Sequence, residues 1–505
     1  MKKFCRIFFS KILLFVLLFV LEFLIFYVFI KYLNDNYLIA RFTLVVFDLI
    51  IFFSIINKNG CPEFKIPWIV ILFLFPYFGL LCYIFFATKS VPRKKQKFFK
   101  YYSEKLSRFI DVNTKNNKLG KFNDIGVYLS KTIDAKAFTN NKLKYYKVGE
   151  DFYFDLIKDL NSAKDFILME YFIIQESSMW DGIHEVLKQK VKEGVDVSIM
   201  YDDFGSLGKM PKFYSYKLNK EGIKSIKFNP FRPSLTGVHN NRDHRKITVI
   251  DGKVAFTGGI NIGDEYINRK NRFGHFKDSA IRVEGPAVKA FTKMFLELYS
   301  FNKNKEGNYE RYMSAKPETF EENGVVIPFC TGPKPLYAEQ VAENNFINII
   351  SKARHHIYFT TPYLIMDNSL TNALRNAALR GIDVRIITPH IPDKKIVFAM
   401  TRSSYPYLME AGVKIYEYTP GFIHEKTMIV DDEIAFIGTI NLDYRSLAHH
   451  YECGAILYKC DVIQDIKKDY DNLFEVSIMM TEKNYKQYKI TRIFCSFLNL
   501  FSTLF

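Results

Sequence analysis

The chain has 505 residues, enough for two domains of ordinary size together with additional segments. Lys and Arg total 70 against 53 Asp and Glu, so the formal net charge is +17, which favours nucleic acid or an anionic membrane surface as a partner. The seven cysteines include no CxxC pair and no Cys/His cluster with zinc-finger spacing, which excludes a zinc finger and argues against a disulfide framework.

Three apolar stretches open the chain, at residues 12–30, 37–56 and 68–87. Each has about the 20 residues that a helix needs to cross the hydrocarbon core, so residues 1–90 are predicted to form a membrane region with two to three transmembrane helices. Five basic residues follow at 93–100, and the positive-inside rule then places the rest of the chain in the cytoplasm. The N-terminus is basic as well, so the topology of the first stretch stays open.

The remainder of the chain follows one plan twice. Each half has an apolar strand, a helix and a second apolar strand, and Gly-x-Asp-Val follows the helix in both. These segments are 165–174, 182–193 and 194–203 in the first half, and 356–365, 368–380 and 381–390 in the second. The alternation predicts an α/β fold in which two tandem domains with largely parallel sheets form a pseudo-twofold pair.

The predicted domain boundaries follow from these segments. Residues 91–140 are assigned to a basic linker, 141–320 to the first domain and 321–489 to the second. The last stretch, 490–505, is apolar but too short to span a bilayer comfortably. We predict that it docks on a membrane surface, and a helix packed on the second domain is the alternative.

One 18-residue pattern occurs in both halves, as HRKITVIDGKVAFTGGIN from position 244 and HEKTMIVDDEIAFIGTIN from position 424. Five residues recur at identical offsets, namely His244, Lys246, Asp251, Gly258 and Asn261 in the first copy, and His424, Lys426, Asp431, Gly438 and Asn441 in the second. His and Lys are two residues apart, so on a strand they point to the same face. Two complete copies at the same spacing indicate a duplicated site rather than chance.

Two His, two Lys and two Asn that converge on one axis supply what transfer at a phosphodiester requires. One His can attack phosphorus and form a phosphohistidine, while the other protonates the leaving oxygen and then deprotonates the second acceptor. Lys246 and Lys426 are predicted to be fixed cations, and Asn261 and Asn441 amide donors to the nonbridging oxygens. We expect no metal and no cofactor, because the sequence shows no acidic cluster with a two-metal arrangement.

Four acids near the repeat have predicted roles. Asp278 and Glu452 occupy matching positions after the two motifs and are predicted to orient the histidines, a surface charge at a strand start being the alternative. Asp251 and Asp431 belong to the repeated pattern and are included among the catalytic residues, although both lie at turns, where a structural role through backbone hydrogen bonds is equally open. The adjacent pair His449-His450 is not expected to bind a metal.

Both copies of the motif resemble the phospholipase D superfamily, which is marked by two HxKxxxxD motifs. Within it the chain is similar to the bacterial cardiolipin synthases along nearly its whole length, including LMEYFII, FKDSAIRVEGPAV and TPYLI. The chain departs from that family in its third apolar stretch. It also has Phe276, Lys277 and Asp278 where the family often has Trp-Arg-Asp.

The resemblance implies a phosphatidyltransferase without a cofactor. One phosphatidylglycerol passes its phosphatidyl group through a phosphohistidine to the headgroup hydroxyl of a second, and glycerol is released. By analogy His244 is the nucleophile and His424 the acid and base, although the near-equivalent halves leave this open. The expected partners are phosphatidylglycerol and other anionic phospholipids, and no nucleic acid is expected. The expected location is the bacterial cell (cytoplasmic) membrane, which the chain would cross several times with its catalytic domain on the cytoplasmic side.

Other functions fit parts of the sequence. A hydrolytic phospholipase D or another phosphatidyltransferase would use the same residues with a different acceptor. A nuclease of the superfamily is less consistent with the sequence, because DNA binding does not explain the apolar membrane stretches. A non-catalytic lipid-binding scaffold would need neither histidine. The oligomeric state, the second donor lipid and any regulation are not determined by the sequence.

Overall fold

The computed structural model describes residues 20, 24, 38–75, 79–80, 82–87, 91–110, 117–230, 241–307, 309–338, 340–485 and 489–504. These residues fall into two compact units. One unit consists of the described residues before position 91 and after position 495. The other consists of Val91–Pro230 and Asn241–Cys495, and it contains both copies of the repeated pattern.

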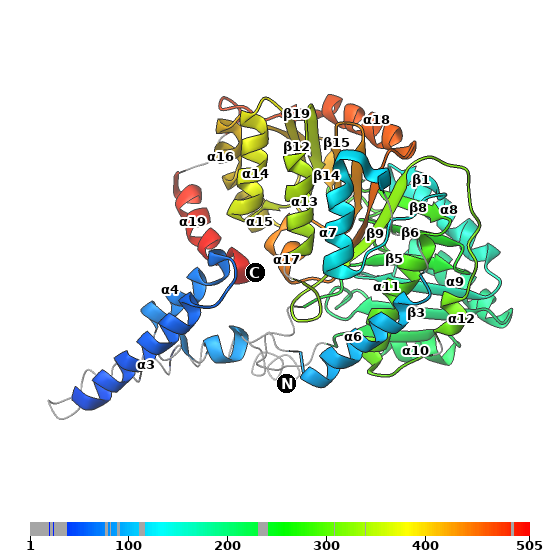
Figure 1. The fold of residues 1–505 in the computed structure, drawn as a ribbon, viewed down its shortest axis with the longest axis horizontal. Helices are drawn as coiled ribbons and strands as arrows, with labels where there is room; N and C mark the ends of the chain where they lie inside the picture. The colour runs from blue at the N-terminus through cyan, green and yellow to red at the C-terminus, as the bar shows by residue number, and fades with distance from the viewer. Residues whose placement is uncertain are drawn as a thin grey trace. The chain divides into compact units, whose positions relative to one another are not determined.

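The first half of the large unit is built on a seven-stranded sheet with the order β1-β8-β6-β5-β2-β3-β4 (Figure 1). Helices α8 and α9 lie against this sheet and share an apolar core with β2 and β3. The strands are β1 Lys142–Tyr146, β2 Phe166–Tyr171, β3 Asp196–Asp202, β4 Lys224–Phe228, β5 Lys246–Ile250, β6 Val254–Gly258 and β8 Ala280–Glu284. The helices are α8 Gly149–Ser162, α9 Ser178–Lys192, α10 Tyr214–Lys220, α11 Val288–Lys303 and α12 Glu310–Met313.

The second half repeats this arrangement in an eight-stranded sheet with the order β19-β13-β12-β10-β15-β16-β18-β9. The strands are β9 Val325–Thr331, β10 His356–Thr360, β12 Asp383–Pro389, β13 Lys414–Tyr418, β15 Thr427–Val430, β16 Ile434–Gly438, β18 Glu452–Tyr458 and β19 Ser477–Met479. The helices are α13 Val341–Ser351, α14 Asn368–Leu379, α15 Lys395–Ser403, α16 Tyr405–Glu410, α17 Tyr444–Ala448 and α18 Val462–Glu475. The order β8-β6-β5-β2-β3-β4 matches β18-β16-β15-β10-β12-β13, so the two α/β halves share one topology.

The sheets are mixed, which corrects the prediction that they are largely parallel. Among the described residues of the two large sheets, parallel pairing is confined to β2-β3-β4 in the first half and β10-β12-β13 in the second. The repeated pattern itself forms the hairpin β5–β6 or β15–β16, whose strands must be antiparallel because a short turn joins them. The hairpin turns begin at Asp251 and Asp431, which have positive φ angles of 53° and 55°, a conformation that Asp tolerates better than most residues.

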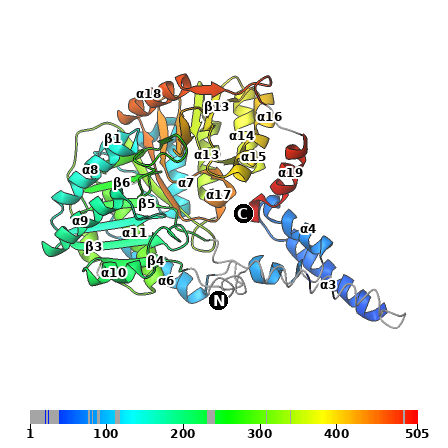
Figure 2. The same cartoon turned by 180° about the vertical axis from the view of Figure 1, so that it is seen from behind.

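One apolar core joins the two halves. It contains residues of β5, β6 and β8 from the first sheet and of β15, β16 and β18 from the second, together with α11 and α18. The helices α8 and α9 of the first half, and α13 and α14 of the second, pack into separate outer cores (Figure 2). Because the repeated hairpins border the shared core, their N-terminal ends are brought to one place.

Residues 91–140, the predicted basic linker, contain three helices among the residues that the structure describes. They form α6 Arg93–Ser107, the short helix η4 Asn117–Phe122 and α7 Asn123–Ile133. Phe99, Tyr102 and Leu106 are buried at helical spacing on α6, and Phe99 packs edge-on against Phe301 of α11 at 5.7 Å. Helix α7 belongs to the outer core of the second half. The basic side chains of α6 therefore lie on an amphipathic helix that is part of the large unit.

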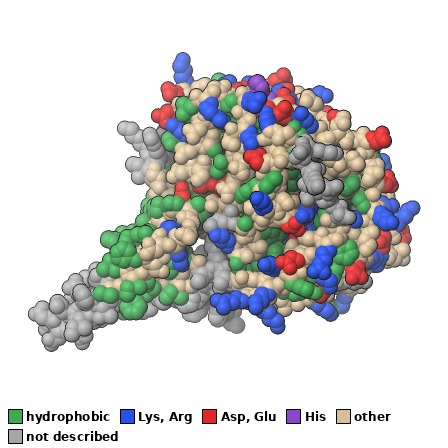
Figure 3. Space-filling view, in the orientation of Figure 1, with side chains coloured by type: hydrophobic (Ala, Val, Ile, Leu, Met, Phe, Trp, Pro, Cys, Tyr) green, Lys and Arg blue, Asp and Glu red, His purple; other side chains and the backbone are tan. Residues whose placement is uncertain are grey.

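The small unit contains α3 Leu38–Ile56, η2 Pro62–Phe64, α4 Ile66–Leu74, η3 Tyr83–Ala87 and η6 Ser502–Leu504. Hydrophobic side chains gather on the outer surface of α3 and α4 (Figure 3). Phe73 and Leu74 are 84% and 63% exposed. Among the described residues, none of the helices combines the length and the apolar character that crossing a membrane requires. The predicted stretch at 12–30 lies outside the described residues except for positions 20 and 24.

Helix α19 spans Lys489–Leu500, within the apolar stretch predicted to dock on a membrane. Phe494 and Phe497 are about half exposed on this helix, whereas Cys495 is buried.

Two short sheets complete the topology. The strand pair β7 His275–Lys277 and β14 Gly421–Ile423 is parallel and joins the first half to the second. The second pair is β11 Leu364–Ile365 with β17 Leu442–Asp443. The β7–β14 pair matters for the site because it leads directly into Asp278 on one strand and His424 on the other.

Candidate active site

The two histidines of the repeat meet at the junction of the halves. The backbone N–H of His244 donates to the carbonyl of Tyr451 at 2.9 Å, and that of His424 donates to the carbonyl of Lys277 at 2.7 Å. Tyr451 and Lys277 each immediately precede one of the predicted orienting acids. The two backbone hydrogen bonds are equivalent and related by the pseudo-twofold axis. Each places an acid of one half beside the histidine of the other half.

Each histidine is held by a carboxylate from the opposite half. Nδ1 of His244 lies 2.9 Å from Oε2 of Glu452, and Nδ1 of His424 lies 2.7 Å from Oδ2 of Asp278. Both carboxylates are fully buried. Each acid is thus in contact with a histidine, and the crossed pairing is a feature that sequence reasoning did not specify. In the neutral imidazole this contact fixes the proton on Nδ1 and leaves the Nε2 lone pair free.

The two carboxylates differ in how many donors they serve. Glu452 also accepts from the hydroxyls of Thr439 and Ser446. Within the described part of the chain, Asp278 accepts one further hydrogen bond, from the backbone N–H of Ser279 at 2.9 Å. A carboxylate with fewer competing donors holds an imidazolium better, so the two histidines are not electrostatically equivalent.

The lysines of both halves act on the same pair of imidazoles. Lys246 and Lys426 are both 2% exposed, and each Nζ donates to the carbonyl of the histidine two residues before it. Burial lowers the pKa of Lys246 to about 8 and that of Lys426 to about 7. Burial, together with these lysines, lowers the pKa of His244 well below its usual range and that of His424 to about 4. Both imidazoles are therefore neutral at neutral pH in the empty site.

The two asparagines differ in how firmly they are held. Oδ1 of Asn261 accepts from the N–H of Ile173 at 3.0 Å, and its Nδ2 donates to the hydroxyl of Tyr266 at 3.0 Å. Asn441 is anchored by its backbone N–H, which donates to Ser446, and its buried Oδ1 has no hydrogen-bond partner among the described residues. Oδ1 of Asn441 can only accept a hydrogen bond, so a contact of this carboxamide with an anionic phosphoryl oxygen must be made by its Nδ2.

Asp251 and Asp431 lie away from this site, at the far ends of β5 and β15. The Asp251 carboxylate accepts backbone N–H groups of Lys164, Asp165 and Phe166 at 2.8 to 2.9 Å. Asp431 does the same for Arg354, His355 and His356. A strand separates both carboxylates from the histidines. The geometry therefore assigns them to fastening the hairpin to the start of the neighbouring strand, and it does not support their inclusion among the catalytic residues.

Sequence reasoning missed the aromatic walls of the site and His450. The His424 ring lies between Tyr266, Phe276 and Phe422, with centroid separations of 5.7, 5.5 and 5.9 Å. The His244 ring contacts Phe172 at 4.9 Å and His450 at 5.5 Å. The position of His450, two residues before the orienting acid Glu452, matches that of Phe276 before Asp278, and this offset was visible in the sequence.

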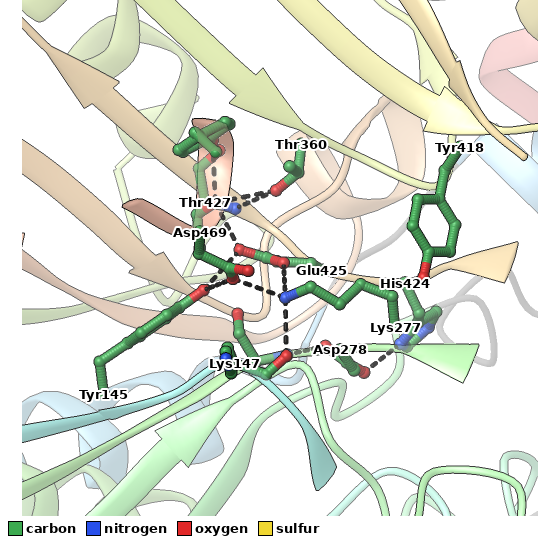
Figure 4. A network of polar contacts seen from close by, with 12 residues as sticks. Tyr145, Lys147, Lys277, Asp278, Thr360, Tyr418, His424, Glu425, Thr427 and Asp469 are labelled. Carbon is green, nitrogen blue, oxygen red and sulfur yellow. Dashed lines mark hydrogen bonds and ion pairs between the residues drawn. The ribbon is translucent and has the colours of Figure 1, made fainter. Parts of the chain in front are cut away.

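A buried ionic network supports the Asp278–His424 pair (Figure 4). Nζ of Lys277 lies 2.7 Å from Glu425 and 2.6 Å from Asp469, and it also donates to the carbonyl of Lys147. The hydroxyl of Tyr145 donates to both carboxylates. Because Lys277 precedes Asp278 and Glu425 follows His424, this network fixes the backbone next to both members of the Asp278–His424 pair.

One group of side chains in the described part of the chain has metal-ligand spacing. Donor atoms of His244, His450 and Glu452 all lie within 4.8 Å of one another. Glu452 is already occupied by three side-chain donors, and Lys246 and Lys426 act on His244 as positive charges. A divalent cation here would displace the Nδ1 proton and face both ammonium groups. The donor set fits proton handling better than a metal centre.

Comparison with known proteins places this site in a family. A family model described as "Cardiolipin synthase, PLD-like domain" matches residues 156–298 and 346–474. An uncharacterized protein of Streptococcus mutans is 42% identical over 433 residues, which cover 84% of this chain and 93% of that protein. A cardiolipin synthase of Alkalihalophilus pseudofirmus is 35% identical over 438 residues, covering 84% and 86%.

Among solved structures, a phosphatidylserine synthase of Haemophilus influenzae has a TM-score of 0.55 and 12% identity, over 76% of this chain and 98% of its own, which supports the fold alone. The family model and the sequence relatives together show that the chain belongs to the cardiolipin synthase family of proteins with phospholipase D-like domains.

Proposed function

We propose that the chain is a membrane-bound phosphatidyltransferase that makes cardiolipin and glycerol from two molecules of phosphatidylglycerol. One observation carries the reaction type. Two buried, neutral imidazoles face one another's lysines, and each is oriented at Nδ1 by a carboxylate of the other half. Such a site supplies a nucleophile, a separate acid and base, and cations for the phosphoryl oxygens. The named relatives supply the substrate class, since several of them are cardiolipin synthases.

In the first half-reaction, Nε2 of His244 attacks the phosphorus of one phosphatidylglycerol. The bond from phosphorus to Nε2 forms as the bond to the headgroup oxygen breaks, and protonated His424 gives its proton to the departing glycerol oxygen. Lys246, Lys426 and the Asn441 carboxamide stabilise the nonbridging oxygens. Asn261 supports Tyr266 and the loop at Ile173, and Asp251 and Asp431 fasten the hairpins.

In the second half-reaction, neutral His424 takes the proton of a headgroup hydroxyl on the second phosphatidylglycerol. That oxygen attacks phosphorus, and the bond to Nε2 of His244 breaks. Cardiolipin leaves with both histidines returned to their starting states. Water entering at this step instead would give phosphatidic acid.

The asymmetry of the carboxylates supports His244 as the nucleophile. Glu452 divides its charge among three side-chain donors, whereas Asp278 serves the His424 ring with only one backbone competitor. His424 is therefore the better proton carrier. The phosphodiester brings a negative charge, worth about 4 kcal/mol at 4 Å for an effective dielectric constant near 20, and this moves the pKa of His424 back toward neutrality. Substrate binding thus favours the protonated form of His424, which acts as the acid.

Membrane location and domain plan belong to the same proposal. Residues 1–90 form the multi-pass membrane region and the two phospholipase D-like domains lie on the cytoplasmic side. The exposed Phe73 and Leu74 of α4 and the basic residues of α6 support this arrangement. The exposed Phe494 and Phe497 of α19 support docking of the C-terminal segment on a membrane surface. In the soluble part separated from residues 1–90, deleting residues 490–505 should weaken binding to anionic vesicles, and undiminished binding would remove the docking role.

One experiment tests the function. The detergent-purified protein is incubated with phosphatidylglycerol alone, and glycerol, cardiolipin and phosphatidic acid are measured. Equal amounts of glycerol and cardiolipin are expected, with no product from His244→Ala or His424→Ala. Phosphatidic acid as the main product would indicate a hydrolase, and no turnover would indicate a lipid-binding scaffold.

A further inference from the structure

His450 lies against the nucleophile although it is not part of the repeated pattern. Its backbone N–H donates to the carbonyl of Arg445 at 2.8 Å just after α17, and its side chain is 9% exposed. The ring lies 5.5 Å from that of His244, at an interplanar angle of 40°, and stacks on Phe172 at 6.4 Å. The imidazole is therefore fixed on two sides within the site.

The structural counterpart of His450 in the other half is Phe276. Each residue stands two positions before an orienting acid, and Phe276 lies 5.5 Å from the His424 ring at an angle of 45°, almost the same geometry. Packing against the catalytic ring thus needs only an aromatic side chain. A phenyl group meets that need in one half, so the imidazole in the other half must be explained by its polar atoms.

In the empty site those polar atoms lie near one carboxylate, Glu452, which raises the pKa of His450 against the effect of burial. Nδ1 and Nε2 of His450 are both buried, and neither has a hydrogen-bond partner among the described residues. The nearest acid, Glu452, is 3.7 Å from Nδ1, beyond hydrogen-bonding distance, and its oxygens already serve His244, Thr439 and Ser446. A buried donor without a partner lowers stability, so its presence at a site indicates a partner that arrives with the substrate.

The charge state of His450 limits which groups can be its hydrogen-bond partner. Burial, aided by His244 and Arg445, lowers the pKa of His450 to about 3, so the ring is neutral whenever the enzyme is near neutral pH. A neutral imidazole donates one hydrogen bond without adding a third cation between Lys246 and Lys426. The atoms that approach the His244 ring during phosphoryl transfer are the nonbridging oxygens of the group bonded to Nε2.

We propose that His450 is a catalytic residue of the half-reaction at His244, in which its ring N–H donates a hydrogen bond to a nonbridging oxygen of the phosphorus bonded to His244. This proposal rests on the phosphoryl-transfer function proposed above. His450 keeps its proton throughout, and no bond to it forms or breaks. The hydrogen bond stabilises the transition state and the phosphohistidine on one side of the pseudo-twofold axis only.

The test compares three variants of the full-length protein in detergent micelles. His450→Phe reproduces the packing found at Phe276, His450→Asn keeps a neutral N–H donor, and His450→Ala removes both. Two rates are measured, cardiolipin formation from phosphatidylglycerol and the first burst of p-nitrophenol from bis(p-nitrophenyl) phosphate. Thermal unfolding shows which variants are folded.

His450→Phe should unfold close to the wild-type temperature but lose about 10- to 100-fold in kcat and in the nitrophenol burst, with KM little changed. His450→Asn should recover most of both rates, equally at pH 6 and pH 8, because neither donor titrates in that range. Full activity of folded His450→Phe, or an Asn variant as slow as the Phe variant, would overturn the proposal. A wild-type protein that makes no cardiolipin yet shows a burst dependent on His450 would refute the proposed substrates and leave the role of His450 standing.

Discussion

His244 is oriented by Glu452, a carboxylate 208 residues further along the chain and in the other half of the fold, with 2.9 Å between Nδ1 and Oε2. In the reciprocal pair, His424 and Asp278 are 146 residues apart in the chain, and Nδ1 of His424 lies 2.7 Å from Oδ2 of Asp278. The halves therefore do not hold two complete copies of a site. Each half contributes a histidine whose Nδ1 contacts an acid of the other half, so the proposed reaction depends on the interface between the halves.

The crossed pairing predicts different defects for Glu452→Gln and Asp278→Asn. Glu452 serves the nucleophile, so E452Q should slow the nitrophenol burst from bis(p-nitrophenyl) phosphate by about 10²- to 10⁴-fold. Asp278 serves the leaving-group acid, so D278N should lose a similar factor with phosphatidylglycerol but little of the burst, because nitrophenolate leaves without a proton. Initial rates on both substrates decide which histidine attacks phosphorus. A slow burst in D278N with a normal burst in E452Q would mean that His424, which Asp278 holds, is the nucleophile.

Asp251 is expected to affect folding rather than chemistry. Asp251→Ala removes the acceptor for three backbone N–H groups and should lower the free energy of unfolding by about 1–3 kcal/mol. Asp251→Asn keeps an acceptor and tolerates the positive φ, so it should be milder. Both should retain kcat within about 3-fold when folded, since no step above uses this carboxylate. Loss of turnover in a stable Asn variant would return Asp251 to the catalytic residues.

Lys277 is expected to be a main support of the interface. Lys277→Met leaves the buried carboxylates of Glu425 and Asp469 without their cation, which should cost about 3–5 kcal/mol of stability. Lys224→Met is the matched control, because Lys224 is half exposed where it pairs with Asp196, and this pair should be worth less than about 1 kcal/mol. Thermal unfolding of both variants measures the difference. Equal effects would show that the buried network contributes no more than a surface pair.

Acid should destabilise the protein partly through His450. Its pKa of about 3 in the folded protein lies below the usual value near 6.5, so between these pH values the unfolded chain binds a proton that the folded chain does not. Stability therefore falls as pH decreases from 6.5, by about 1.4 kcal/mol per pH unit for this group, or about 3 kcal/mol by pH 4.5. Unfolding temperatures of wild type and His450→Phe, close together at pH 7, should separate at pH 6, 5 and 4.5, because the wild type alone loses this stability. A constant gap between them would mean that His450 does not titrate in this way.

The sequence by itself determined the local geometry of each half. The spacing of His and Lys by two residues fixes one face of a strand, and the alternation of apolar strands with helices fixes the α/β plan, because both depend only on periodicity along the chain. The roles expected for Asp278 and Glu452 came from their matching strand-like places after the motifs. The mixed character of the sheets was missed, although the hairpin in each motif already required antiparallel neighbours.

Only the tertiary structure decided which residues meet. The crossing of Asp278 to His424 and of Glu452 to His244 follows from two sheets packing on one shared core, and so does the placement of His450 against His244. The same packing leaves Asp251 and Asp431 at the far ends of their strands. Such contacts join residues more than 140 positions apart, and their energy comes from burying both surfaces together. No periodicity within one segment encodes that pairing.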